Sequence, residues 1–243
     1  MLDFAHQAES LLRDALPQGS DAENSTLPDT VIRRAYPLLS NDWKCHSFVQ
    51  GVNREDLTAF LLGLKNTIVA EGTDKDIVYE ARHVIKNILL QKPELSWRDS
   101  NGKITAELVE VLDPKHRKEV LCQPGMINRL VSVGLNKWED TTVIGWLNQY
   151  GDQDRLDILC TDGFLDALLW AGDIAQQKNN RVAVMRWVSD LSEGAKGRLV
   201  NAGGAAEAIE SVFGKVGENF VKKYRCLTNT DFLGENAPRA LPA

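Results

Sequence analysis

The sequence predicts an all-α fold. Apolar residues recur at three- and four-residue spacing over much of the chain, which is the period of an amphipathic helix. The sequence contains no long alternating run of β-branched residues, the pattern typical of strands. A short pattern of leucine, glycine and a second apolar pair also occurs three times, beginning at Leu121, Leu159 and Leu199. Such a repeat favours stacked helices, which bury their apolar faces against neighbouring repeats.

The first helix is expected over residues 2–16, where leucines and alanines follow a helical period. This run stops at Pro17, and residues 17–29 are rich in Ser, Asp, Asn, Gly and Pro, which predicts a linker. Pro28-Asp29-Thr30 then supplies start signals for the next helix. From there to about residue 226 the chain is expected to be mainly helical.

Two neighbouring helices are expected at 56–69 and 76–90, joined as a hairpin by Glu71-Gly72-Thr73-Asp74. The glycine suits the end of the first helix, and the Thr and Asp suit the start of the second. Their apolar stripes consist of Leu57, Phe60, Leu61, Leu64 and Ile68 in the first helix, and Val78, Ala81, Val84, Ile85, Ile88 and Leu89 in the second.

The spacing of the repeated pattern is not uniform. Its first two copies are 38 residues apart at every matched position, and Gly203 of the third copy follows Gly163 by 40. Gly102 precedes Gly125 by only 23 residues, so a copy near residues 100–125 is expected to be truncated or distorted.

Residues 183–194, with Leu199-Val200-Asn201-Ala202-Gly203-Gly204 after them, resemble the junction between two armadillo repeats. Residues 143–172 are similar to the same pattern. The resemblance extends over about residues 56–215, and HEAT-type arrays share its short helices and glycines. It implies a right-handed superhelix of irregular armadillo-like helical repeats. The expected organisation is therefore an N-terminal helix and linker (1–29), a helical-repeat domain (30–227) and a flexible tail (228–243).

The resemblance also implies a binding surface. In armadillo proteins the third helices line a groove, and importin-like members hold an extended peptide there with a Trp and an Asn four residues later. The positions of this chain that match that pair are His83, Asn87, Gly145, Gln149, Arg186 and Asp190. Trp146 and Trp187 each fall one position later, about 100° further around the helix, which favours packing in the core for both.

The charge of the chain argues against a nucleic-acid backbone as a partner. The 243 residues include 28 Lys and Arg against 34 Asp and Glu, a net charge of −6, with a pI near 5.3. The strongest basic cluster, Lys115-His116-Arg117-Lys118, is interpreted as a solvated helix end.

Neither a metal nor a cofactor is expected. The four cysteines form no CxxC pair, and the four histidines form neither an i, i+4 pair nor an HExxH motif. Cys122 and Cys160 share one repeat position and are expected to be small buried residues. The cysteine pattern favours a reducing, cytoplasmic location, and no apolar run approaches the roughly 18 residues of a membrane span.

These observations predict a non-enzymatic protein-protein interaction module, an adaptor or scaffold. It would bind a protein or extended peptide on the concave face of the superhelix. The alternative is a nucleic-acid-processing enzyme, such as a DNA glycosylase on a HEAT-like scaffold, with Trp146, Trp187 and Asp190 on its concave face. A third interpretation is a domain of a larger scaffold, whose repeat ends dock against further sequence.

Overall fold

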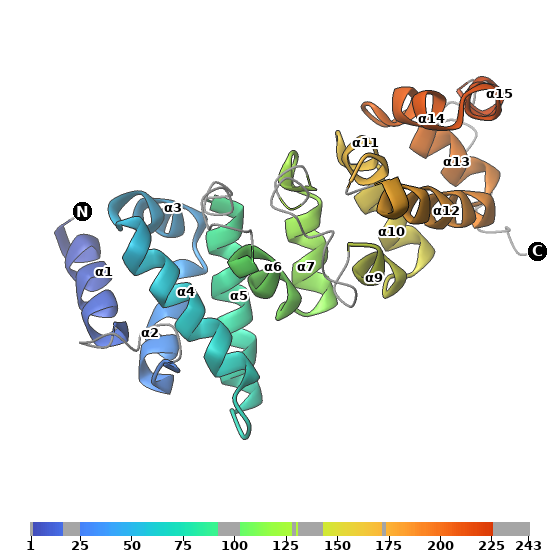
Figure 1. Ribbon diagram of the computed structural model, residues 1–243. Coiled ribbons are helices and arrows are strands. Elements are labelled where there is room, and N and C mark those ends of the chain that lie inside the picture. Colours follow the sequence, from blue (N-terminus) through green and yellow to red (C-terminus); the bar gives the residue numbers. More distant parts are fainter. Residues whose placement is uncertain are drawn as a thin grey trace, which may run out of the picture. The chain divides into compact units, whose positions relative to one another are not determined.

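The computed structural model describes residues 2–16, 25–91, 103–127, 130, 143–171 and 174–225 (Figure 1). These residues form α-helices joined by turns and contain no strand, so the expected all-α fold is confirmed. They divide into two compact units, one up to Gln123 and one from Pro124 onward. The predicted tail at 228–243 and most of the predicted linker lie outside the described residues.

Helix α5 is the centre of the first unit, because α2, α3, α4 and α7 all pack against it. The N-terminal helix α1 contacts α2, α3 and α4, so it belongs to the same packed body. The helices of this unit are α1 (Leu2–Ala15), α2 (Asp29–Leu39), α3 (Asp42–Gly51), α4 (Arg54–Val69), α5 (Lys75–Gln91), α6 (Lys103–Glu110) and α7 (Pro114–Leu121).

The hairpin predicted from the sequence is formed by α4 and α5, which pack on each other. The Asn53 side chain caps α4 by accepting a hydrogen bond from the backbone N–H of Asp56. Between the helices Gly72 has a φ of 80°, a conformation that suits only glycine. The predicted apolar stripes are buried except for Ile68 and Val78, which are half-buried.

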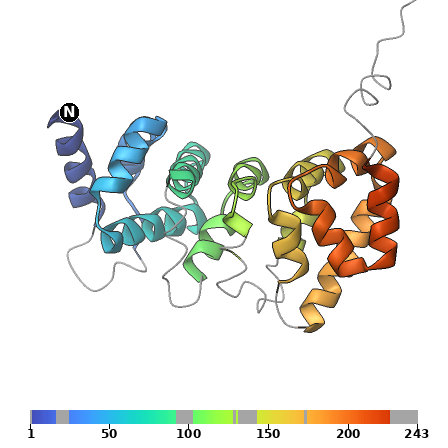
Figure 2. The same ribbon diagram turned by 90° about the horizontal axis from the view of Figure 1, so that it is seen from above.

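In the second unit, α14 packs against α11 and α15, and α13 packs against α10, α14 and α15. Figure 2 shows these C-terminal helices, coloured orange to red, gathered together. The helices of this unit for which bounds are given are α9 (Val143–Asn148), α10 (Asp152–Leu159), α11 (Phe164–Leu169), α12 (Ile174–Asp190), α13 (Glu193–Val200), α14 (Ala205–Phe213) and α15 (Lys215–Tyr224).

The repeated sequence pattern forms the same turn three times. After α7, α10 and α13 a glycine adopts the left-handed conformation, with φ of 75° at Gly125, 70° at Gly163 and 74° at Gly204. A side chain with a Cβ would be strained at each of these positions. The spacings are therefore 38 and 41 residues. The alignment of Gly203 with Gly163 is wrong by one residue, because Gly204 is the residue with positive φ.

The interpretation of Lys115-His116-Arg117-Lys118 as a solvated helix end is wrong for its two central residues. His116 and Arg117 are buried, at 4% and 5% exposure. The cluster lies in α7, whose N-cap Asp113 accepts hydrogen bonds from the His116 backbone N–H and contacts its imidazole at 2.7 Å. Its central residues therefore hold the first unit together rather than face solvent.

The described cysteines differ in burial. Cys45 is fully buried, and this burial, with nearby Asp42, raises the pKa of its thiol to about 12. Cys122 and Cys160, expected to be buried, are only half-buried. None of the helices in the described part of the chain is long and apolar enough to cross a membrane.

Candidate interaction surface

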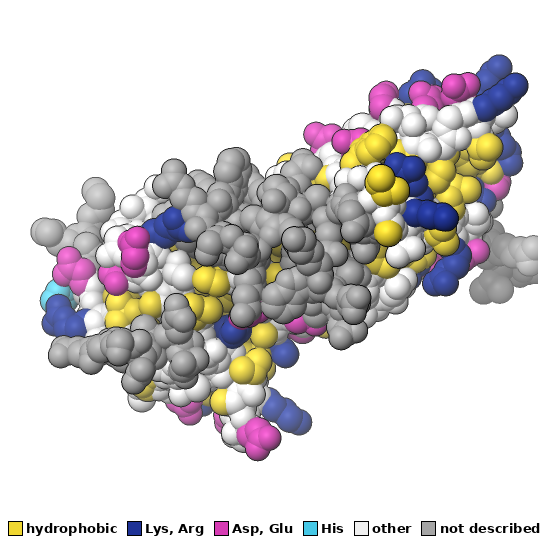
Figure 3. Space-filling model, viewed as in Figure 1, with side chains coloured by type: hydrophobic (Ala, Val, Ile, Leu, Met, Phe, Trp, Pro, Cys, Tyr) yellow, Lys and Arg dark blue, Asp and Glu magenta, His cyan; other side chains and the backbone are white. Residues whose placement is uncertain are grey.

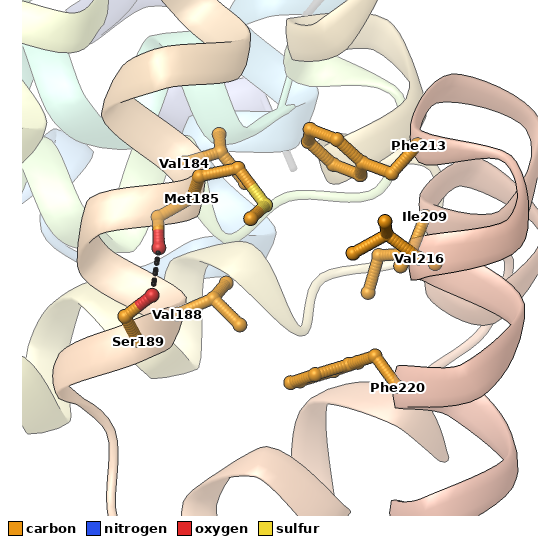
Figure 4. A pocket seen from close by; sticks show the side chains of 9 residues that line it. Val184, Met185, Val188, Ser189, Ile209, Phe213, Val216 and Phe220 are labelled. Carbon is orange, nitrogen blue, oxygen red and sulfur yellow. Dashed lines mark hydrogen bonds between the residues drawn. The ribbon is translucent and has the colours of Figure 1, made fainter.

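The second unit has an apolar hollow between α12, α14 and α15 (Figure 4). Helix α12 supplies one wall through Val184, Met185, Val188 and Ser189. These residues lie at positions i, i+1, i+4 and i+5, which form one stripe along a helix. The Ser189 hydroxyl donates to the carbonyl of Met185 at 2.7 Å, so it is turned toward its own helix and this wall stays apolar.

Helices α14 and α15 form the opposite wall, with Ile209 and Phe213 from α14 and Val216, Gly217 and Phe220 from α15. Figure 4 shows these side chains directed toward Met185 and Val188 across an open gap. Gly217 allows the two helices to cross closely, because a Cβ at this position would lie 2.3 Å from the backbone oxygen of Ile209. Together with its mouth, the hollow encloses about 400 Å³.

Exposure rises from the floor of the hollow to its rim. Val184 and Ile209 on the floor are 1% and 4% exposed, whereas Met185 and Val216 at the rim are 40% and 65% exposed. Complete burial of a Val or Met side chain is worth about 1.5–3 kcal/mol. A contiguous apolar surface of this kind, left in contact with water, is typical of a binding site.

Basic residues surround the hollow in an otherwise acidic chain. Helices α12 and α15 carry six basic and two acidic residues, which are Lys178, Arg181, Arg186, Lys215, Lys222 and Lys223 against Asp190 and Glu218. Helix α14 adds Glu207, which pairs with Arg225 at 3.6 Å, and Glu210. Figure 3 shows hydrophobic side chains interspersed with those of Lys and Arg on this unit. The surface therefore favours an apolar segment that carries negative charge.

Two of the six residues predicted for the binding surface lie beside the hollow. Arg186 and Asp190 are exposed on α12, next in sequence to the lining residues Met185 and Ser189. Within the described part of the chain neither has a hydrogen-bond or ion-pair partner. Their side chains are thus available to a ligand.

The other four predicted residues are not part of the hollow. Gly145 is half-buried in α9, and Gln149 is exposed just after that helix. Asn87 is 5% exposed and belongs to the first unit, where its amide donates to the carbonyl of Leu39 at 2.8 Å. This bond occupies one of the unpaired carbonyls at the end of α2, so Asn87 has a structural role.

His83 lies in an aromatic cluster of the first unit. Its ring centroid is 5.3 Å from that of Tyr36, 6.2 Å from that of Tyr79 and 5.4 Å from that of His116. Its Nδ1 atom is buried and has no hydrogen-bond partner among the described residues. His83 is therefore packed between α2 and α7 rather than presented as a free contact residue.

The surroundings of His83 favour its neutral form. Burial is the largest cause and lowers the pKa of the imidazole. The positive charges of Lys86 and Lys115, together with His116, lower this pKa further, while Glu119 opposes them. Lys86 and Glu119 themselves form an ion pair of 2.7 Å.

We expect His83→Phe to flatten the dependence of stability on pH between pH 7.5 and 5.5. The His83 pKa is lowered in the folded chain, so the unfolded chain binds more protons as the pH falls through about 6.5. The stabilisation by neutral His83 is complete above this pH and is lost below it. Thermal unfolding followed by circular dichroism at several pH values measures both profiles, and parallel profiles would contradict the assignment.

Both tryptophans near the predicted surface lie in the core, as their sequence positions indicated. Trp146 and Trp187 are 1% and 3% exposed. The indole N–H of Trp187 donates to Asn148 at 3.2 Å, and the guanidinium of Arg155 lies 5.3 Å from its ring centroid. Neither ring is available to stack on a nucleic-acid base, so the alternative based on these residues has no exposed aromatic platform.

The residues that form the hollow were not found from the sequence. Val216 and Phe220 are spaced as one helical face of α15, but Val221 and Tyr224 form a second face that is fully buried. Two apolar faces on one short helix are the sequence feature that indicates an additional contact surface.

The described residues contain no group of three or more His, Cys, Asp or Glu side chains placed to hold a metal ion. No family model, curated protein or solved structure matches this chain, and its function is therefore inferred from the geometry of the hollow and the charges around it.

Proposed function

We propose that this chain is a non-enzymatic protein-protein interaction module, an adaptor or scaffold, in which the apolar hollow of the second unit binds a segment of a partner protein. The observation that carries this proposal is the exposed apolar rim of Met185 and Val216 above a buried apolar floor. Arg186 and Asp190 lie at the edge, where they can pair with polar groups of the segment.

The proposed scaffold is a right-handed superhelix of irregular armadillo-like repeats. The three turns with left-handed glycines support it, since each joins two short helices in the same way. Basic residues also recur in register with these turns, with Arg117, Arg155 and Lys196 spaced by the same 38 and 41 residues. A stack of such units presents a continuous surface to extended ligands.

We expect Met185→Glu to weaken binding of a partner segment by at least about tenfold. The substitution removes the burial of one rim side chain and places an unpaired charge against apolar walls, and about 1.4 kcal/mol corresponds to a factor of ten. Segments are selected from a displayed peptide library on the wild-type chain and then titrated against the variant. The matched control is Val69→Glu, because Val69 is 62% exposed on α4 and does not line the hollow.

The double variant Arg186→Ala and Asp190→Ala tests the edge of the site with the same peptides. We expect a smaller loss of affinity, about two- to tenfold, with an unchanged melting temperature, because both side chains are exposed and make no contact within the described chain. Selected segments that bind wild type and Met185→Glu equally would contradict the proposed function.

A further inference from the structure

The chain itself contains a segment that is complementary to the apolar hollow. Beyond Arg225 the sequence includes Asp231-Phe232-Leu233-Gly234-Glu235. Phe232 is the only aromatic residue after Tyr224, and with Leu233 it forms an apolar pair between two carboxylates. Apolar walls with a basic surround are the surface that such a segment fits best.

This segment is within reach of the hollow. Seven residues lead from Arg225 to Phe232 and span at most about 25 Å. Phe220 and Val216 precede Arg225 by five and nine residues, which places them about 8 and 14 Å back along the axis of α15. A chain that reverses direction after α15 can therefore bring Phe232 over any part of the hollow.

The other apolar residues that follow α15 fit this geometry less well. Leu227 is two residues beyond Arg225 and reaches at most about 7 Å, which is too short to pass over Val216. Residues 237–243 contain two prolines and two alanines but no second pair of large apolar residues. Phe232 and Leu233 are the pair with both the size and the distance that the hollow requires.

Resting on the proposed function, we propose that residues 231–235 bind in the apolar hollow of the same molecule and thereby compete with the partner segment. Met185 and Val216 are the rim residues that Phe232 and Leu233 cover. The carboxylates of Asp231 and Glu235 lie toward the basic residues of α12 and α15. The hollow is then a regulated site, open to a partner only when the segment is displaced.

The expected strength of this competition follows from the short connection. A segment tethered by a few residues has an effective concentration of about 1 mM. A free peptide of the same sequence with a dissociation constant of about 0.1 mM would then occupy its own hollow about ten times out of eleven. Binding of any external segment would be weakened about tenfold by the same ratio.

The first test places a photoreactive benzophenone amino acid at position 232 of the full chain. Irradiation is expected to give cross-links at monomer size, mapped by mass spectrometry to peptides of α12 or α15. The cross-link should be lost when Met185→Glu is added and kept when Val69→Glu is added. Cross-links at dimer size would assign the hollow to a second copy, and cross-links outside the hollow, or none, would equally overturn the proposal.

The second test measures competition on the full chain. A fluorescein-labelled peptide of residues 229–236 is titrated against wild type and against the double variant Phe232→Ser and Leu233→Ser. The variant is expected to bind the peptide about tenfold more tightly, because its own segment no longer occupies the hollow. Equal affinity for the two chains would overturn the inference.

The two proposals can fail separately. Library-selected segments that require Met185, together with no binding of the 229–236 peptide, would reject the intramolecular segment and leave the interaction module intact. If no segment of any sequence binds in a manner that depends on Met185, the proposed function itself is rejected.

Discussion

Gly217→Ala is expected to lower the melting temperature of the second unit by about 10 °C. The new methyl carbon would lie 2.3 Å from the backbone oxygen of Ile209, 2.9 Å from its carbonyl carbon and 3.2 Å from the Cα of Glu210. These are backbone atoms, so the strain cannot be relieved by a side-chain rotation and α15 must move away from α14. Overpacking of this kind costs about 1–3 kcal/mol or more, against a gain of at most about 1 kcal/mol from replacing a helical glycine.

The connection between the two helices makes such a movement difficult. Gly214 is the single residue between α14 and α15, with φ of 53° and ψ of −134°, so the helices have almost no slack at that end. A net loss of about 2 kcal/mol corresponds to roughly 8–16 °C in a unit of this size. Affinity for a partner segment should fall as well, since Gly217, Val216 and Phe220 lie on the same stretch of α15.

The matched control is Gly51→Ala. Gly51 is the last residue of α3, it is exposed, and no atom lies within 4 Å of the position its Cβ would take. This variant is expected to be as stable as wild type or slightly more stable, because alanine is the better helix former. Calorimetry and circular dichroism measure both variants, and equal melting temperatures for the two would show that α14 and α15 do not cross as closely as described.

The helices could be predicted from the sequence because their evidence is local. The period of apolar residues located α4 and α5 to within two residues at their ends, and Gly72 marked the turn between them. Local patterns also indicated that Trp146 and Trp187 are buried. In each case the relevant contacts are made within one helix or between successive helices.

The hollow could not be predicted in the same way, because it depends on how closely two helices cross. Nothing in the sequence around Gly217 distinguishes a glycine in contact with another backbone from one that faces solvent, such as Gly51. The resemblance to armadillo repeats located Arg186 and Asp190 on the exposed side of α12, yet it also assigned Asn87 to the surface. The sequence does not show that the Asn87 amide is taken by the carbonyl of Leu39.

Short-range reasoning was also misleading for buried charge. A run of four basic residues is usually solvated, but Arg117 is 5% exposed because its guanidinium meets backbone carbonyls at the end of α6. Arg155, 38 residues later, does the same at the end of α9, where it donates to Leu147 and Tyr150 at 3.0 and 2.6 Å. The repeat spacing was the evidence that linked these two arginines, and it indicates a shared structural role.

Arg117→Ala is therefore expected to destabilise the first unit by about 3–4 kcal/mol. The guanidinium donates to the carbonyls of Val109 at 3.2 Å, Glu110 at 2.8 Å and Leu112 at 2.9 Å. These carbonyls follow or end a helix and have no partner within it, so removal of the side chain leaves buried acceptors unsatisfied as well as a cavity. Equilibrium unfolding in urea, monitored by circular dichroism, measures the loss.

Two further substitutions separate this mechanism from a general effect of charge. Arg117→Lys keeps the charge, but a single ammonium group cannot reach three carbonyls that a planar guanidinium bridges, so less than half of the stability should be recovered. Arg155→Ala should cost less than Arg117→Ala, because Arg155 donates to two carbonyls and is less deeply buried. Arg33→Ala, at an exposed position of α2, should change stability by no more than about 0.5 kcal/mol. Full recovery by lysine at position 117 would show that charge, rather than the hydrogen bonds to these carbonyls, stabilises the end of α6.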